Sequence, residues 1–313
     1  MNNLIEVRNL KKFFNVSLGK LHAVEDISFD IKKGETLGLV GESGCGKSTT
    51  GRAVLRLIEA TDGEVRYQGE DIFSFDSTKM KEMRKKLQII FQDPYSCLDN
   101  RKTVSQIIAE PLKIHRIAKG NALNEMVLEL MKSGGINEKL YNSYPHELDG
   151  GSRQRVGIIR SLALNPEFIV CDEPVSALDV SIQAQILNLL QDIQEQRDLT
   201  YLFISHDLSV VKHISNKIMV MYLGKTAEVS ESDELFLNPA HPYTKALLSA
   251  IPVPIYNYKS ERIILKGDVP SPINPAQGCR FASRCNYTKA ICNECDPELI
   301  EIGPKHFVAC HLY

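Results

Sequence analysis

The sequence predicts an α/β fold, in which buried strands alternate with helices. Short apolar runs typical of buried strands occur at residues 36–40, 87–91, 168–171 and 200–205, and they alternate with stretches of helical character. Glycine-rich or polar segments follow these runs, at the strand ends where ligands gather in such sheets. The segments that follow the strands are therefore the candidates for a functional site.

The first 35 residues are predicted to be β-rich. Residues 5–7 and 23–31 form apolar strand-like runs, and Lys33 and Gly34 close the second of them. Phe13 and Phe14 lie between the two runs, in a stretch that we expect to be a short polar loop. An aromatic ring in this loop could stack on the flat ring of a ligand, or it could simply cover the edge of the core.

A glycine-rich loop, GESGCGKST, follows the first buried run and fits the pattern of glycine, four residues, then Gly-Lys-Ser. A strand precedes it and residues 50–59 have helical character, which is the context that the pattern requires. The glycines let backbone N–H groups point at phosphate oxygens, and the helix dipole favours an anion. The sequence therefore predicts nucleotide binding. The loop comprises Gly41, Glu42, Ser43, Gly44, Cys45, Gly46, Lys47, Ser48 and Thr49.

Composition and charge fit a soluble protein with more than one domain. The chain has 313 residues, of which 43% are hydrophobic and 24% charged. Its 37 basic and 39 acidic residues give a net charge of −2, which offers no electrostatic argument for nucleic-acid binding. No apolar run approaches the roughly 18 residues that would span a bilayer, and residues 1–10 lack a signal-peptide core, so we expect a cytosolic protein.

The middle of the chain is mainly helical. Residues 79–86 have a basic face and are predicted to form a solvated helix. Gln92 ends the strand at 87–91, and residues 104–140 have the periodicity of a helical insertion. The stretch YPHELDGGS at 144–152 precedes a helix predicted at 153–164, so its Gly-Gly pair is a second potential anion site.

Two adjacent carboxylates, Asp172 and Glu173, end the buried run at 168–171. Because burying two charges is costly, a Mg²⁺ ion or a water partner explains them better than a structural role does. His206 stands at the carboxyl end of the strand at 200–205, where its position favours a function over the usual structural role.

The last part of the chain differs in composition. Beyond Glu231 prolines punctuate a segment with little regular periodicity, so we place a domain boundary near residue 235. Five of the eight cysteines lie within the last 35 residues, and because disulfides are not expected in a reducing cytosol, the cluster indicates a metal. The spacing is not a repeated CxxC pair, so a [4Fe-4S] cluster, a zinc ion and thiols that merely pack all remain open. The cysteines are Cys279, Cys285, Cys292 and Cys310, with Cys295 as an extra.

Together these motifs resemble, in type and order, those of ABC-type ATPases. The stretches at 172–190 and 241–254 and the cysteine-bearing tail are similar, more narrowly, to ATP-binding subunits of dipeptide and oligopeptide importers. The sequence around the glycine loop resembles the second of their two ATPase subunits. The matching motifs are Gly41 to Thr49 for Walker A, Gln92 for the Q-loop, Leu148 to Ser152 for the signature motif, Ile169 to Asp172 for Walker B, Glu173 for the catalytic glutamate, Ser176 to Asp179 for the D-loop and His206 for the switch histidine.

The resemblance implies a P-loop NTPase (RecA-like) core with an ABC β-subdomain. This core would comprise residues 1–95 and 153–235, and a helical subdomain at 96–152 would carry the signature motif. Residues 236–313 would form a small metal-binding extension, with a [4Fe-4S] cluster on Cys279, Cys285, Cys292 and Cys310 and zinc as the alternative.

Roles for individual residues are implied in the same way. Phe14, or less favourably Phe13, would stack on adenine, and Lys47 would hold the phosphates. Ser48 and Gln92 would bind Mg²⁺ directly, with Asp172 acting through water. Glu173 would polarise the attacking water and His206 would contact the γ phosphate. The signature motif that reaches a partner's nucleotide would be Leu148, Asp149, Gly150, Gly151 and Ser152, and the D-loop would be Ser176, Ala177, Leu178 and Asp179.

The signature motif departs from the family pattern Leu-Ser-Gly-Gly-Gln at Asp149 and Ser152. A carboxylate near phosphate oxygens would cost about 1 to 4 kcal/mol at roughly 4 Å, depending on the effective dielectric. We therefore infer, as a hypothesis, a heterodimer in which the site completed by Asp149 is slow or only structural. The alternative is that Asp149 turns away from the nucleotide or takes a proton.

The resemblance implies an ATP-hydrolysing subunit that energises import of dipeptides and oligopeptides. Its expected partners are a second ATPase subunit, two membrane permease subunits and, through the complex, an extracellular peptide-binding protein. It would lie peripherally on the cytoplasmic face of the membrane, where a permease helix would dock beside Gln92. Alternatives are a nickel, glutathione or muropeptide importer, a non-transport ABC ATPase, and a module that binds ATP without hydrolysing it.

Overall fold

The computed structural model describes residues 3–251 and 262–313, which divide into two units. The first unit contains the chain up to Phe73 and from Phe203 onward, and the second contains Ser74 to Leu202. The chain passes from the second unit to the first within β8 (Thr200–Ser205). Residues 252–254, the end of the importer-like stretch at 241–254, lie outside the described residues.

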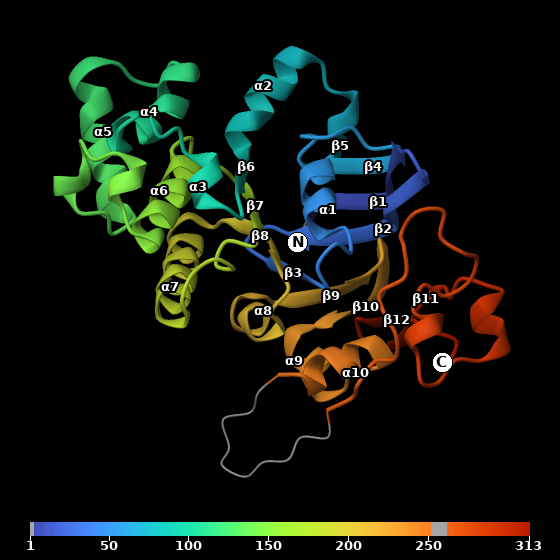
Figure 1. Cartoon of the computed structure of the whole chain (residues 1–313). Helices are drawn as coiled ribbons and strands as arrows, with labels where there is room; N and C mark the ends of the chain where they lie inside the picture. Colours follow the sequence, from blue (N-terminus) through green and yellow to red (C-terminus); the bar gives the residue numbers. More distant parts are fainter. Residues whose placement is uncertain (1–2, 252–261) are drawn as a thin grey trace, which may run out of the picture. The chain divides into compact units, whose positions relative to one another are not determined.

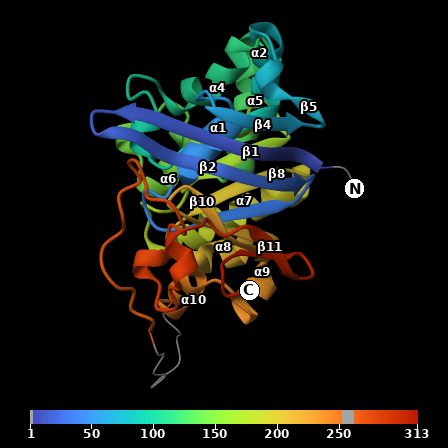
Figure 2. The ribbon, with the colours of Figure 1, turned by 90° about the vertical axis from the view of Figure 1, so that its right-hand side faces the viewer.

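A four-stranded antiparallel sheet with the order β2-β1-β4-β5 forms one part of the first unit (Figure 1). Figure 2 shows β1 and β2 as two long neighbouring strands. The prediction that Phe13 and Phe14 lie in a loop is wrong, because β1 continues through both and pairs them with His22 and Leu21. The polar side chains that indicated a loop lie on a half-exposed stretch of strand. The strands are β1 (Asn3–Val16), β2 (Gly19–Lys32), β4 (Asp62–Tyr67) and β5 (Glu70–Asp71).

The other sheet of the first unit has the strand order β11-β12-β10-β9-β3. Strand β3 is buried at all five residues and runs parallel to β9, as expected for a nucleotide-binding α/β core. Despite its weak periodicity, the tail beyond residue 235 adds β12 to β10 and then β11 to β12. The elements are β3 (Thr36–Val40), α1 (Lys47–Val54), α8 (Leu208–Ile214), β9 (Lys217–Tyr222), β10 (Lys225–Glu231), α9 (Ser232–Leu237), α10 (Pro242–Ser249), β11 (Leu299–Gly303) and β12 (His306–Ala309).

The second unit combines two parallel strands with a group of helices. The helical insertion predicted within 104–140 is confirmed as α4 and α5, and their apolar stripes pack with α6. The helix at 79–86 is confirmed as part of α2, in which only Met83 is buried. No helix within the described ranges is both long and apolar enough to cross a membrane. The elements are α2 (Ser77–Lys86), β6 (Leu87–Ile90), α3 (Pro94–Cys97), α4 (Val104–Ile114), α5 (Gly120–Ser133), α6 (Gly150–Leu162), β7 (Phe168–Asp172) and α7 (Val180–Arg197).

Candidate nucleotide-binding site

The glycine loop connects β3 to α1 within the first unit. The helix begins at Lys47 and ends at Val54, earlier at both ends than the predicted range 50–59, so its first N–H groups lie directly at the loop. Gly46 has φ 103°, and a side-chain carbon there would lie 2.0 Å from the carbonyl oxygen of Ala23. Only glycine fits this position, which lets the loop turn tightly into the helix.

Lys47 is 4% exposed and lies inside the loop. Its Nζ donates to the carbonyl oxygens of Gly41 (2.8 Å) and Glu42 (3.0 Å). The ammonium is therefore desolvated and held by the same backbone that surrounds the predicted phosphate position. A phosphate oxygen could replace these neutral acceptors with a charge-assisted hydrogen bond.

The two neighbouring aromatic residues of β1 have different surroundings. Phe13 packs against the ring of His22, with centroids 4.3 Å apart, and under the ammonium of Lys20. Phe14 is 36% exposed and contacts the ammonium of Lys12 at 4.8 Å. Because its ring keeps accessible surface, Phe14 remains the better candidate for stacking on a base.

His206 follows β8 at an exposed position in the first unit. The next residue, Asp207, donates its N–H to the Ser205 hydroxyl (3.0 Å) and accepts the N–H of Ser209 with its carboxylate (2.8 Å) as the cap of α8. The backbone on both sides of the histidine is therefore fixed. This arrangement holds the imidazole at the carboxyl end of a buried strand, as the sequence predicts.

The second unit brings together three of the predicted site residues. Asp172 ends β7 and is 1% exposed, and Glu173 follows it in the left-handed conformation at φ 47°. Such a conformation is unfavourable for a glutamate and is concentrated at functional sites. Gln92, 81 residues earlier in the chain, donates from Nε2 to Glu173 Oε2 at 2.9 Å. The predicted Q-loop and catalytic residues are therefore in direct contact.

The predicted signature motif forms the start of α6. The helix begins at Gly150, so the expectation that the Gly-Gly pair precedes a helix starting at Arg153 is wrong. Asp149 caps the helix by accepting the Ser152 N–H (2.7 Å) and the Ser152 hydroxyl (3.0 Å). The hydrogen bond from the Ser152 N–H lowers the pKa of Asp149 most, and the bond from the Ser152 hydroxyl lowers it further. The lowered pKa argues against proton uptake by Asp149 at neutral pH.

The predicted D-loop connects β7 to α7 in the same unit. Asp179 caps α7 by accepting the N–H of Ile182 (3.0 Å), and the amide of Gln183 donates to the carbonyl oxygen of Leu178 (3.0 Å). A side-chain carbon on Gly151 would lie 2.8 Å from Ile182 Cγ2, so the signature glycine packs directly on α7. The signature motif and the D-loop are thus one packed structure.

Two residues that contact the glycine loop were not predicted. The N–H of Glu42 donates to the hydroxyl of Tyr243 at 2.8 Å, and the Arg284 guanidinium contacts the Glu42 carboxylate at 2.7 and 3.1 Å. Tyr243 lies in the importer-like stretch at 241–254, but no sequence pattern connects it with residue 42. These contacts depend on tertiary packing alone.

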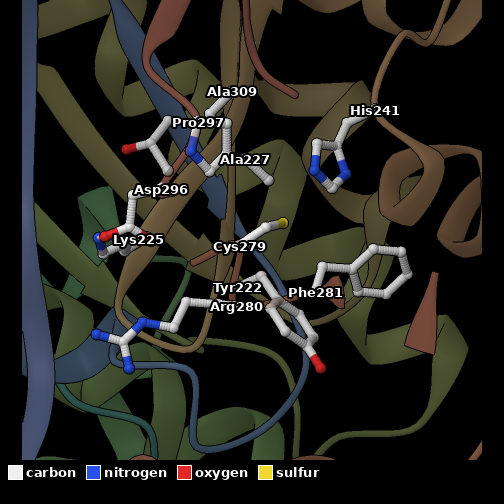
Figure 3. Close-up of a pocket in the computed structure, with 11 residues that line it drawn as sticks. Tyr222, Lys225, Ala227, His241, Cys279, Arg280, Phe281, Asp296, Pro297 and Ala309 are labelled. Atoms are coloured by element: carbon white, nitrogen blue, oxygen red, sulfur yellow. The ribbon is translucent and has the colours of Figure 1, made fainter. Parts of the chain in front are cut away.

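The cysteine-bearing tail gathers four thiols. Burial raises the pKa of Cys279 to about 11, and the nearby thiols of Cys292, Cys310 and Cys285 add to the increase. Figure 3 shows Cys279 in a pocket beside Tyr222 and His241.

The backbone around these thiols supplies hydrogen-bond donors to sulfur. Tyr287 N–H donates to the sulfur of Cys285 (3.3 Å) and Lys289 N–H to that of Cys292 (3.4 Å). Donors of this kind also stabilise metal-bound thiolates. Within the described residues, however, no group of three or more His, Cys, Asp or Glu side chains is arranged to hold a metal ion.

Sequence comparison places the chain among known proteins. A family described as ABC transporter matches residues 24–176, and one described as oligopeptide/dipeptide transporter, C-terminal region, matches residues 227–292. The oligopeptide transport ATP-binding protein AppF of Bacillus subtilis is 52% identical over 99% of this chain and 97% of its own length. The chain belongs to the family of oligopeptide transport ATP-binding proteins. OppF of the same organism is also 52% identical, over 98% of this chain and 96% of its own.

Solved structures share the fold of this chain. The ATP-binding cassette MJ0796, described as a dimer in a post-hydrolysis state bound to ADP and Pi, aligns with a TM-score of 0.67 at 28% identity, covering 73% of this chain and 98% of that chain. The protein cbiO1 from Clostridium perfringens aligns with a TM-score of 0.67 at 26% identity, covering 76% and 92%. The α/β fold of the ABC cassette, predicted from the sequence, is confirmed.

Proposed function

We propose that this subunit hydrolyses ATP to energise the import of oligopeptides through a membrane-bound ABC transporter complex. The observation that carries the proposal is the full-length similarity to the oligopeptide transport proteins AppF and OppF. The match of residues 227–292 to the oligopeptide/dipeptide transporter C-terminal region adds to it, because this region lies outside the part matched by the general ABC transporter family.

Each unit contributes its own part of the reaction. In the first, Lys47 and the loop N–H groups bind the β and γ phosphates, Phe14 stacks on adenine, and His206 contacts the γ phosphate. In the second, Glu173 polarises the attacking water. Positioning and electrostatic stabilisation supply most of the catalysis in phosphoryl transfer of this kind. The contact between Gln92 and Glu173 supports these roles in the second unit.

The residues proposed for Mg²⁺ carry the oxygen donors that this ion prefers. Ser48 offers a hydroxyl and Gln92 an amide oxygen as direct ligands, whereas Asp172 offers a carboxylate that acts through water. Bound Mg²⁺ neutralises charge that develops on the phosphates. The nitrogen of the Gln92 amide donates to Glu173. The amide oxygen takes no part in this hydrogen bond, so it can serve as a metal ligand.

Partners are proposed on the family membership and on one surface of the second unit. A groove there is lined by Gln88, Phe91, Ser96, Cys97 and Arg160, near the Q-loop glutamine. A cytoplasmic helix of a membrane permease fits this kind of groove, and closure of an ATP-bound dimer with a second ATPase subunit would move that helix. The subunit would then lie peripherally at the cytoplasmic face of the membrane, in a complex that also uses an extracellular peptide-binding protein.

The tail is proposed to hold a [4Fe-4S] cluster on Cys279, Cys285, Cys292 and Cys310, with a structural role. The four neighbouring thiols and the N–H donors to sulfur support it. A single tetrahedral zinc ion would need its sulfurs only about 3.8 Å apart, given Zn–S bonds of about 2.3 Å. A four-iron cluster is larger than a single zinc ion and holds its thiolates farther apart.

Reconstitution tests the proposed function. The subunit would be assembled in liposomes with its second ATPase, permease and binding protein, and ATP hydrolysis measured with and without oligopeptide. We expect stimulation by oligopeptide that disappears with Lys47→Ala. Stimulation by nickel, glutathione or muropeptide in place of oligopeptide would identify a related importer. Hydrolysis that none of these solutes changes would favour a non-transport ATPase.

The unequal-site hypothesis predicts that Asp149→Ser raises ATP hydrolysis by the assembled complex at least about fivefold, the factor that corresponds to about 1 kcal/mol of relieved repulsion. Serine also caps helices well, so α6 should keep its stability. The matched control is Asp76→Ser, which changes the cap of α2 in the same manner. Equal turnover for the parent and Asp149→Ser would mean that the carboxylate, engaged with Ser152, does not disturb the partner's nucleotide.

A further inference from the structure

Glu42 is an acidic residue inside a loop that is proposed to bind phosphates. A free carboxylate at this place would repel a polyphosphate and weaken its binding. The structure holds this residue at three points: its N–H by Tyr243, its carbonyl oxygen by Lys47 and its carboxylate by Arg284. The carboxylate is thereby paired and drawn toward the C-terminal part of the chain.

Arg284, a buried residue of the first unit, makes the contact with the Glu42 carboxylate. The residue is 8% exposed and ends the short turn η4 (Ala282–Arg284), which lies between two cysteines of the tail, Cys279 and Cys285. Its Nη1 reaches one carboxylate oxygen of Glu42 at 2.7 Å and its Nη2 the other at 3.1 Å, a two-point geometry that fixes direction as well as charge. Nη1 also donates to the hydroxyl of Tyr222 at 3.3 Å.

Three packed aromatic rings, those of Tyr222, Tyr243 and Phe281, support the contacts that Tyr243 and Arg284 make with Glu42. Phe281, at 2% exposure, packs on Tyr222 and Tyr243 with ring centroids 5.2 and 5.5 Å away, and the two tyrosines lie 4.8 Å apart. Tyr243 is fully buried in α10. The group joins α10, the end of β9 and the turn before Arg284, so it fixes where the guanidinium and the Tyr243 hydroxyl meet the loop.

We propose that Arg284 is a positioning residue for ATP binding: by pairing with Glu42 it keeps a loop carboxylate away from the phosphates and holds the loop open for them. This inference rests on the proposed role of residues 41–49 as the phosphate loop. It assigns to the C-terminal extension a direct influence on the nucleotide site. Coupling of this kind is reciprocal, so ATP should also stabilise the turn that carries Arg284.

The test measures the dissociation constant for ATP with the purified full-length chain by titration calorimetry. Arg284→Ala leaves the carboxylate unpaired and is expected to weaken binding about tenfold. Adding Glu42→Gln to that variant removes the charge and should restore affinity to within about threefold of the parent. Arg280→Ala is the matched control, since Arg280 is a second arginine of the extension whose partner is Glu25 of β2 and not the loop.

Hydrogen exchange is a second readout, and it does not measure the affinity for ATP. Hydrogen exchange of residues 279–285 should slow when ATP is added to the parent, because the N–H groups of Ala282 and Arg284 close this turn on Cys279 and Phe281. The slowing should be absent in Glu42→Gln/Arg284→Ala. If Arg284→Ala does not fold, Arg284→Lys replaces it, since lysine keeps the charge and loses the two-point geometry, with an intermediate weakening expected.

The outcomes separate this inference from the proposed function. Unchanged affinity in Arg284→Ala, equal weakening in Arg280→Ala, or no recovery on adding Glu42→Gln would each overturn the role of Arg284. Lys47→Ala is included in every titration. If that variant bound ATP as tightly as the parent, the phosphate-loop assignment itself would fail, whatever Arg284 does.

Discussion

Replacing Glu173 with glutamine is expected to lower ATP hydrolysis at least about hundredfold while ATP binding stays within about twofold of the parent. Glutamine has the same shape and still offers an oxygen that can accept the hydrogen bond from Gln92, which is 2.9 Å long in the structure. The side chain would therefore keep its position in the left-handed turn after β7 and lose only the negative charge that polarises water. Turnover and nucleotide affinity should be measured on the same assembled complex.

The control for this prediction is Glu195→Gln, which removes an exposed carboxylate from α7 in the same unit. It should leave both hydrolysis and binding unchanged. Near-normal turnover in Glu173→Gln would contradict the assignment of Glu173. A parallel loss of binding and hydrolysis would instead show that the charge acts in the ground state and not on the attacking water.

Local patterns explain why much of the fold could be predicted. The buried run at Thr36 to Val40, the glycine loop after it and the strand at Thr200 to Ser205 each carry their signal within a few residues, and the structure has these strands at the same bounds. Apolar periodicity identified α4 and α5 for the same reason.

Errors arose where tertiary pairing overrode a local pattern. Phe13 and Phe14 lie among lysines and look like a loop, but pairing with β2 extends the strand past them. The start of α6 was missed because two glycines suggested a turn, whereas the Asp149 cap and the packing of Gly151 on Ile182 begin the helix at Gly150. The strand partner β2 and the packing partner Ile182 lie elsewhere in the chain, whereas the Asp149 cap is local.

In the candidate site, motifs predicted individual residues, whereas the contacts between those residues depend on packing. The motifs identified Gln92 and Glu173 separately, and only the structure shows their hydrogen bond. Arg284 follows no motif, and its contact with Glu42 joins residues 242 positions apart. Long-range contacts of single charged side chains leave no periodicity in a sequence, so they cannot be predicted from one chain alone.

Removing one cysteine of the tail is expected to remove most of its iron and sulfide. Protein purified without oxygen should contain about four irons and about four acid-labile sulfides per chain, with a broad visible absorption band, and Cys279→Ser should lose most of both. Cys279 is the thiol whose pKa is raised by all three of the other proposed ligands, so its removal should disturb the set most.

Cys295→Ser is the matched control, because Cys295 is an exposed thiol of the same tail and is not among the neighbours of Cys279. It should retain the parent's iron. Zinc at about one per chain without iron would replace the cluster by a single ion held by the same thiols. Absence of any metal would mean that the thiols only pack. Neither result would change the assignment of the chain as an ATPase, since that assignment rests on the loop at 41–49, on Glu173 and on the full-length similarity to AppF and OppF.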